Sequence, residues 1–161
     1  MNIFATDSDP QRSALWLDDI RKNKMIVESA QLLSTTIRIL DPKAEDRTDI
    51  YKIFSKNHPC GKWARLSAGN YDWLLEHALA LCWQRSKNNH KTYPILKACK
   101  EWRQDANTSE FFPSREKTSF VNAAANKEKG VCFKHVKDTN EAYRRYLSSR
   151  WQADTIPLTR S

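Results

Sequence analysis

Polar side chains recur along one helix-like segment at spacings that could support acid–base chemistry. Residues 13–39 contain neither glycine nor proline, and successive residues of an α-helix are turned by about 100°. On such a helix a narrow stripe collects Arg21, Lys24, Glu28, Gln31 and Thr35. Apolar residues border this stripe on both sides. The pattern indicates ionisable groups that face a cleft or the protein interior rather than bulk water.

Glu28 is the predicted chemical centre of the stripe. Desolvation between apolar walls raises the pKa of a carboxyl group, whereas a nearby cation such as Lys24 lowers it. Opposing influences of this kind are typical of general acids and bases. Lys24 and Glu28 also have the i,i+4 spacing of an ordinary ion pair, so a buried structural pair is the alternative.

His58 is a second candidate for acid–base chemistry or phosphate contact, and its alternative is a loop histidine that caps the backbone. Lys62 and Arg65 flank an aromatic residue, an arrangement suited to phosphate contact and base stacking. Arginines near the C-terminus could follow a DNA backbone or simply face solvent. The predicted nucleic-acid contacts are Arg21, Gln31, Lys62, Trp63, Arg65, Asn70, Tyr71, Arg144 and Arg145.

The composition favours a polyanionic partner. The net charge is +8, from 27 Lys and Arg against 19 Asp and Glu, and phosphate contacts gain affinity by releasing counterions. The three glycines form no Gly-rich phosphate loop. Four cysteines and four histidines lack metal-ligand spacing. We therefore expect a monomeric protein that acts on double-stranded DNA without a metal, a cofactor or membrane contact. We expect it in the cytoplasm, which is the host cytoplasm if the protein is phage-encoded.

N-cap residues and the periodicity of apolar side chains predict the helices that must position these residues. The sequence predicts an all-α protein: a single compact domain of about four main helices with long irregular connections. The helices are expected at 13–39, 67–85, 92–103 and 138–151, with N-caps at Asp9 or Ser13 for the first. The domain is expected to span 1–154, followed by a frayed tail at 155–161.

Several blocks of the chain resemble a known family. The first lies within residues 2–33 and includes Asp19, Lys24 and Glu28; others are 57–60, 63–74 and 141–146. The first block resembles the opening of the pyrimidine-dimer DNA glycosylases, small all-α UV-repair enzymes known from phages. The blocks resemble still more closely a set of phage and bacterial proteins described by similarity to that family. The nine-residue spacing from Asp19 to Glu28 looks like the family's acidic residue that precedes its catalytic glutamate.

The resemblance implies a mechanism. In the family the N-terminal α-amine attacks the sugar C1′ to form an imine, and the glutamate assists sugar opening and β-elimination. Glu28 would take the glutamate's role, and Met1 would carry the amine because Asn2 is too large for removal of the initiator methionine. Val27 and Gln31 stand where the family places arginines. Two alternatives therefore remain: a phage hypermodification transferase that adds an amino acid to activated 5-hydroxymethyl pyrimidines in DNA, and a non-catalytic nucleic-acid-binding module.

Overall fold

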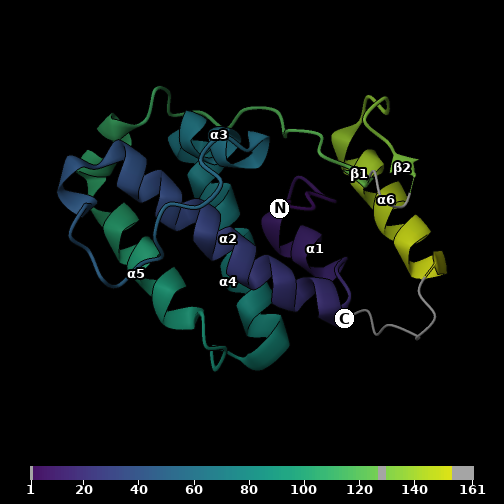
Figure 1. Ribbon diagram of the computed structural model, residues 1–161, viewed down its shortest axis with the longest axis horizontal. Helices are drawn as coiled ribbons and strands as arrows, with labels where there is room; N and C mark the ends of the chain where they lie inside the picture. The colour runs from purple at the N-terminus through teal and green to yellow at the C-terminus, as the bar shows by residue number, and fades with distance from the viewer. Residues whose placement is uncertain (1, 127–129, 154–161) are drawn as a thin grey trace.

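Helices form most of the computed structural model, which describes residues 2–126 and 130–153 (Figure 1). The α-helices are α1 (Pro10–Leu15), α2 (Asp19–Leu40), α3 (Pro59–Leu66), α4 (Ala68–Ser86), α5 (Tyr93–Gln104) and α6 (Thr139–Ala153). Two 3₁₀ helices, η1 (Pro42–Ala44) and η2 (Ala106–Phe111), and an antiparallel hairpin of β1 (Ala125–Asn126) and β2 (Val131–Cys132) complete the described elements. The predicted all-α class is confirmed. The predicted tail at 155–161 lies outside the described residues.

Helices α2 and α4 pack against each other at the centre of the bundle. Helix α4 also packs against α1, α3 and α5. Helix α2 also packs against α3 and α5. Its 22 residues span about 33 Å, and buried side chains such as Ile26, Leu33 and Ile37 face the core. None of the helices in the described residues is both long and apolar enough to cross a membrane.

Two helices occupy the region 13–39, where the sequence predicts one continuous helix. Helix α1 ends at Leu15, and Asp18 starts α2 as its N-cap by accepting a hydrogen bond from the Arg21 backbone N–H at 3.0 Å. Asp9 caps α1, as one of the two expected caps. Ser13 is no cap, because its buried hydroxyl accepts a hydrogen bond from the Thr6 N–H.

The connections between the predicted helices contain ordered structure that the periodicity of apolar residues does not predict. Helix α3 begins at Pro59 with His58 as N-cap, and Ser67, in an extended conformation, separates it from α4. Arg38 organises the preceding loop, because its guanidinium donates to five backbone carbonyls between Ala44 and Tyr51. Residues 112–124 run as an extended connection along the top of Figure 1.

The N-terminal segment Asn2–Thr6 joins the bundle to α6. Ile3, Ala5 and Thr6 have no exposed surface, and the purple segment lies between the bundle and α6 in Figure 1. The Ala5 carbonyl accepts from the Asn140 amide, and the Thr6 carbonyl accepts from the Arg144 guanidinium, both at 2.6 Å. Side chains of α6 thereby satisfy two buried backbone acceptors of the N-terminal segment.

We predict that Gly69→Ala destabilises the fold by about 1–3 kcal/mol. A Cβ at Gly69 would lie 2.4 Å from the Lys117 backbone nitrogen and 2.8 Å from its Cα. Gly61→Ala is the matched control, because its Cβ would meet its nearest atoms at an ordinary 3.6 Å. Urea unfolding should show the loss only for Gly69→Ala, and equal midpoints for the two variants would contradict the close approach of residues 115–117 to α4.

Candidate functional site

A cavity of about 550 Å³ lies where α2, the N-terminal segment, the start of α3 and the chain around the hairpin meet. Its apolar lining includes Phe4, Met25 and Tyr146. Its polar lining consists of Asn2, Lys24, Glu28, His58, Asn122 and Lys134. A volume in this range is typical of small-molecule sites. The cavity therefore unites groups from distant parts of the chain in a concave, partly apolar setting.

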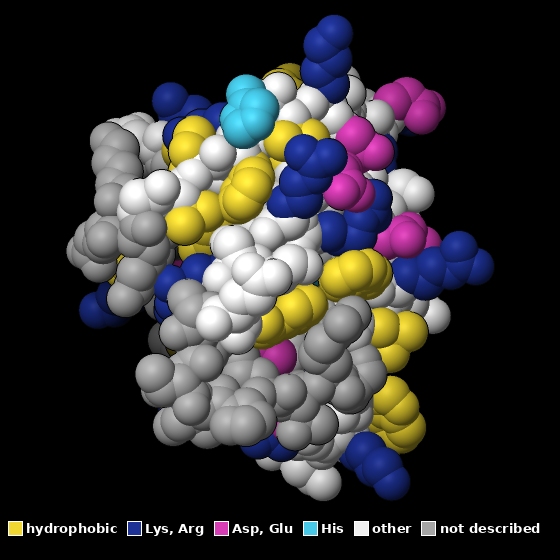
Figure 2. Space-filling view, turned by 90° about the vertical axis from the view of Figure 1, so that its right-hand side faces the viewer, with side chains coloured by type: hydrophobic (Ala, Val, Ile, Leu, Met, Phe, Trp, Pro, Cys, Tyr) yellow, Lys and Arg dark blue, Asp and Glu magenta, His cyan; other side chains and the backbone are white. Residues whose placement is uncertain are grey.

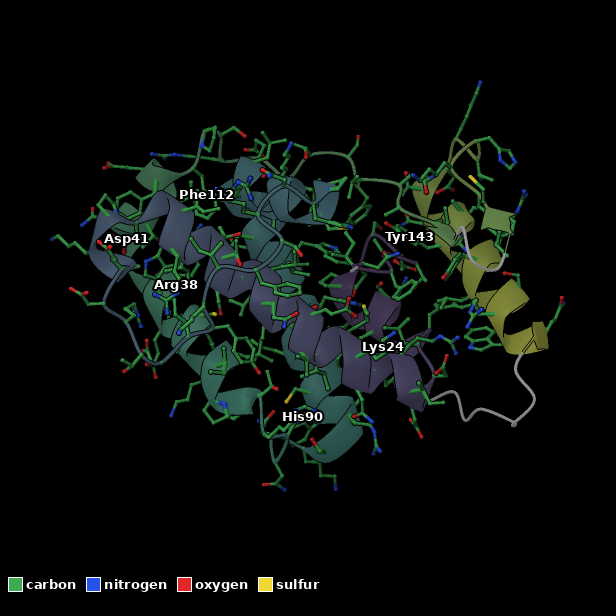
Figure 3. All side chains as sticks on the ribbon, in the orientation of Figure 1. Lys24, Arg38, Asp41, His90, Phe112 and Tyr143 are labelled. Carbon is green, nitrogen blue, oxygen red and sulfur yellow. The ribbon has the colours of Figure 1, made fainter. Side chains whose placement is uncertain are left out.

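Glu28 lines the cavity from α2. Its side chain is partly buried, and its Oε2 atom is shielded from solvent. Lys24, one turn earlier, is exposed and also lines the cavity. A fully buried Lys24–Glu28 ion pair, the structural alternative, therefore does not form. Both residues also line a second depression on α2 with His90 and Lys91; Figure 3 labels Lys24 and His90.

His58 has a structural role as well as a place in the cavity. Its Nδ1 accepts a hydrogen bond from the Cys60 backbone N–H at 3.0 Å, which caps α3. With Nδ1 as an acceptor, the neutral ring carries its proton on Nε2. Burial lowers the pKa of His58, so this neutral form is favoured near pH 7. Capping of the backbone and lining of the cavity are therefore compatible.

The nearby thiol is unsuited to nucleophilic chemistry. Burial raises the pKa of Cys60 to about 12. Because the thiolate rather than the thiol is the nucleophile, Cys60 is unreactive at neutral pH. A Cys–His catalytic pair with His58 is thus disfavoured.

Asn2 fixes two walls of the cavity at once. Its Oδ1 accepts hydrogen bonds from the Ile3 and Phe4 backbone N–H groups at 2.7 and 3.0 Å, and its Nδ2 donates to the Ala123 carbonyl at 3.1 Å. Phe4 has a φ of +47°, which is a strained conformation for a bulky residue. The hydrogen bonds of Asn2 and the burial of Phe4 hold this strained turn at the edge of the cavity.

Tyr143 of α6 supports the opposite wall. Its hydroxyl donates to the Val121 carbonyl at 2.7 Å and accepts from the Ala123 N–H at 3.0 Å. Burial raises the pKa of this hydroxyl, so it stays protonated and able to donate. Helix α6, which carries Tyr143 in Figure 3, thereby positions the segment that contributes Asn122 to the cavity.

The structure brings together three of the predicted catalytic residues: Lys24, Glu28 and His58. The fourth, Met1, lies outside the described residues. Asn122 and Lys134 were not predicted from the sequence. Asn122 reaches the cavity from the connection before the hairpin, and Lys134 reaches it from the segment after the hairpin. No motif or periodicity around either residue indicates this placement.

Two of the predicted nucleic-acid contacts on α2 are only partly exposed. Arg21 forms a 3.1 Å ion pair with the buried Asp18, and its side chain is 11% exposed. Gln31 is partly buried on the stretch of α2 between Glu28 and Thr35. Neither belongs to the cavity lining, so their predicted contacts would lie beside it.

The side chains of Trp63, Asn70 and Tyr71 lie in the core. The Trp63 indole donates to the Ser119 carbonyl at 2.8 Å, and the Tyr71 hydroxyl donates to the Cys99 carbonyl at 2.9 Å. The Asn70 amide joins α4 to α3 and to the 112–124 connection. All three are almost fully buried, so contact with nucleic acid at these positions would require the core to open.

The remaining predicted contacts are more accessible. Lys62 is exposed on α3, while Arg65 is partly buried and donates to the Lys56 carbonyl at 2.7 Å. Arg144 and Arg145 both pair with Glu141, and Arg145 is the more exposed, at 55% of its side chain. Figure 2 shows Lys and Arg side chains interleaved with apolar ones on the right-hand face of Figure 1.

Comparison with protein-family models, curated proteins and solved structures gives no match. Within residues 2–126 and 130–153, no group of three or more His, Cys, Asp and Glu side chains could hold a metal ion. The geometry of the cavity is therefore the basis for the functional argument.

We predict that Tyr143→Phe loosens the cavity wall and costs about 1–3 kcal/mol, because the partly buried Val121 carbonyl and Ala123 N–H lose their hydroxyl partner. Tyr146→Phe is the control: Tyr146 is similarly buried, and no hydrogen bond of its hydroxyl is recorded among the described residues. Urea unfolding should separate the variants, and hydrogen exchange at Ala123 should quicken only in Tyr143→Phe. Unchanged exchange at Ala123 would contradict the supporting role of Tyr143.

Proposed function

We propose that the protein is a DNA base-processing enzyme of the glycosylase type, with Glu28 as its key carboxylate. The observation that carries the proposal is the meeting of Glu28, Lys24 and His58 in one cavity. The net charge of +8 supports a polyanionic substrate. The resemblance of residues 2–33 to pyrimidine-dimer DNA glycosylases led to the same carboxylate independently of its position in space.

The cavity is suited to a single extruded nucleotide. Chemistry at a base or at C1′ requires the nucleotide to leave the base stack, which costs a few kcal/mol. A cavity of about 550 Å³ with apolar and polar walls offers both stacking and hydrogen-bonding surfaces in return. Lys24 and Lys134 supply positive charge for the flanking phosphates.

Glu28 would act where positive charge develops. As the glycosidic bond breaks, the base departs with the bonding electron pair and C1′ becomes electron-deficient. A carboxylate held beside C1′ stabilises that charge and can later accept a proton from the sugar. The shielding of Oε2 from water strengthens such an interaction.

An experiment can identify directly which amine forms the imine. Lys24 and Lys134 both line the cavity, and the α-amine predicted at Met1 belongs to a residue outside the described range. A neutral amine would add to C1′ as the base leaves and lose a proton to give an N-glycosylamine. The C1′–O4′ bond would then break, with its electron pair and a proton going to O4′, and the nitrogen lone pair would form the C1′=N bond of the imine. Borohydride reduction would fix that imine as a stable bond, and peptide mapping would locate it.

The transferase alternative draws on the same two lysines. Cations that line a cavity could neutralise a pyrophosphate leaving group on a 5-hydroxymethyl pyrimidine, with Glu28 activating an incoming amine. Nucleoside mass spectrometry of treated DNA that carries pyrophosphorylated 5-hydroxymethyluracil would reveal the adduct. Binding without any product would favour the third alternative, a non-catalytic nucleic-acid-binding module.

We predict that Glu28→Gln lowers strand incision and borohydride trapping on UV-damaged or abasic duplex DNA by about 100-fold or more. DNA affinity should stay equal or increase, because a negative charge is removed. Glu76→Gln, at an exposed position on α4 outside the cavity, is the control and should retain wild-type incision. Wild-type incision by Glu28→Gln would refute the role of this carboxylate.

A further inference from the structure

Two adjacent apolar side chains project from the loop between η1 and α3. Ile53 is 50% exposed and Phe54 is 48% exposed. Exposed lysines stand on both sides of them, at positions 52 and 56. A loop that merely connected two helices would gain stability by turning such side chains toward the core.

The backbone of this loop is held in place by side chains of α2. The Thr35 hydroxyl accepts from the Phe54 N–H at 3.0 Å and donates to the Phe54 carbonyl at 3.4 Å. Upstream, Ser34 accepts from the Tyr51 N–H, and Arg38 donates to the Tyr51 carbonyl at 2.7 Å. These hydrogen bonds hold the backbone at Phe54 and thereby fix the direction in which its side chain projects.

The far end of the loop is equally constrained. Arg65 donates to the Lys56 carbonyl at 2.7 Å, and the His58 N–H donates to the Ser55 carbonyl at 2.9 Å. Ser55 has a φ of +49°, a conformation that L-residues rarely adopt. A strained backbone supported by several hydrogen bonds presents the apolar pair to solvent, so their exposure is a property of the fold rather than of a loose chain.

The loop lies beside the cavity. It leads directly into His58 and Pro59, which line the cavity. Thr35, which holds Phe54, lies seven residues after Glu28 on α2, a distance of about 10 Å along the helix axis. That distance corresponds to about three base-pair steps of duplex DNA.

We propose that Ile53 and Phe54 form a wedge that enters the base stack of duplex DNA about three base-pair steps from the nucleotide held in the cavity. The proposal rests on the proposed function and adds a specific partner surface to it. Apolar side chains inserted between base steps unstack them and kink the duplex. Lys52, Lys56 and the exposed Lys62 of α3 would contact the neighbouring phosphates.

The wedge would assist extrusion of the nucleotide. Insertion of Phe54 kinks the duplex a few base pairs from the target nucleotide, and the kink lowers the cost of unstacking that nucleotide. Because hydrogen bonds already hold the backbone of this loop, less ordering cost remains to be met on binding. Phe54 thus contributes to affinity and to unstacking without touching the reacting atoms.

The test compares Phe54→Ala with Phe111→Ala in the full chain. Phe111 is the control because it is 38% exposed on η2, outside the cavity lining. Duplex DNA with 2-aminopurine about three base pairs from an abasic site reports unstacking at the wedge position as increased fluorescence. Phe54→Ala should bind this duplex about tenfold more weakly and lose the fluorescence increase, Phe111→Ala should behave as wild type, and Phe54→Trp should restore both signals.

Each outcome bears on the wedge separately from the proposed function. Wild-type affinity and fluorescence for Phe54→Ala would overturn the wedge, even if the protein incises DNA. Loss of both signals in Phe54→Ala supports the wedge, even if no product forms and the enzymatic proposal fails. Phe54-dependent binding to vesicles of phosphatidylserine and phosphatidylcholine, without binding to the duplex, would overturn the wedge in favour of a membrane surface.

Discussion

The burial of the N-terminal segment Asn2–Thr6 is the constraint on which the remaining architecture depends. This irregular segment belongs to no helix or sheet, so side chains from elsewhere must satisfy most of its buried backbone groups. Asn140 and Arg144 do so from α6, and Ser13 does so from α1. Phe4 adds aromatic contacts with Tyr143 and Tyr146, at 6.1 and 5.7 Å between ring centroids. The segment thus binds α6 to the helical bundle, and the cavity opens along this junction.

The same junction explains why the candidate site is chemically mixed. Helix α2 contributes Lys24 and Glu28, the start of α3 contributes His58, and the segment after the hairpin contributes Lys134. The apolar wall comes from residues whose main task is to pack the junction. The Oε2 atom of Glu28 is shielded from solvent, and Lys24 and Lys134 line the same cavity; the proposed role of Glu28 rests on this combination.

The sequence predicted the long amphipathic helices closely because their caps and apolar periodicity agree. Helices α4, α5 and α6 begin or end within about two residues of the expected limits. The break at Asp18 was missed because no glycine or proline marks it, and α3 was missed because eight residues give too short a period to recognise. Lys24, Glu28 and His58 were found from helical spacing and residue type.

Other parts of the site depend on tertiary packing that one sequence does not encode visibly. Lys134 and Asn122 carry no local signal, and reach the cavity only because α6 folds back against Asn2–Thr6. Trp63 and Tyr71 have the composition of a stacking surface but lie in the core. Residue type alone cannot distinguish an aromatic ring that packs inside from one that meets a base.

The most direct measurement of the central claim is hydrogen exchange of the wild-type chain with and without duplex DNA that contains a stable abasic analogue. The account predicts slower exchange in residues 2–6, 24–28 and 121–124 when the DNA is bound, because these segments enclose the cavity. Protection confined to α5 and η2, at the opposite end of α2, would contradict the assignment of this cavity as the DNA site.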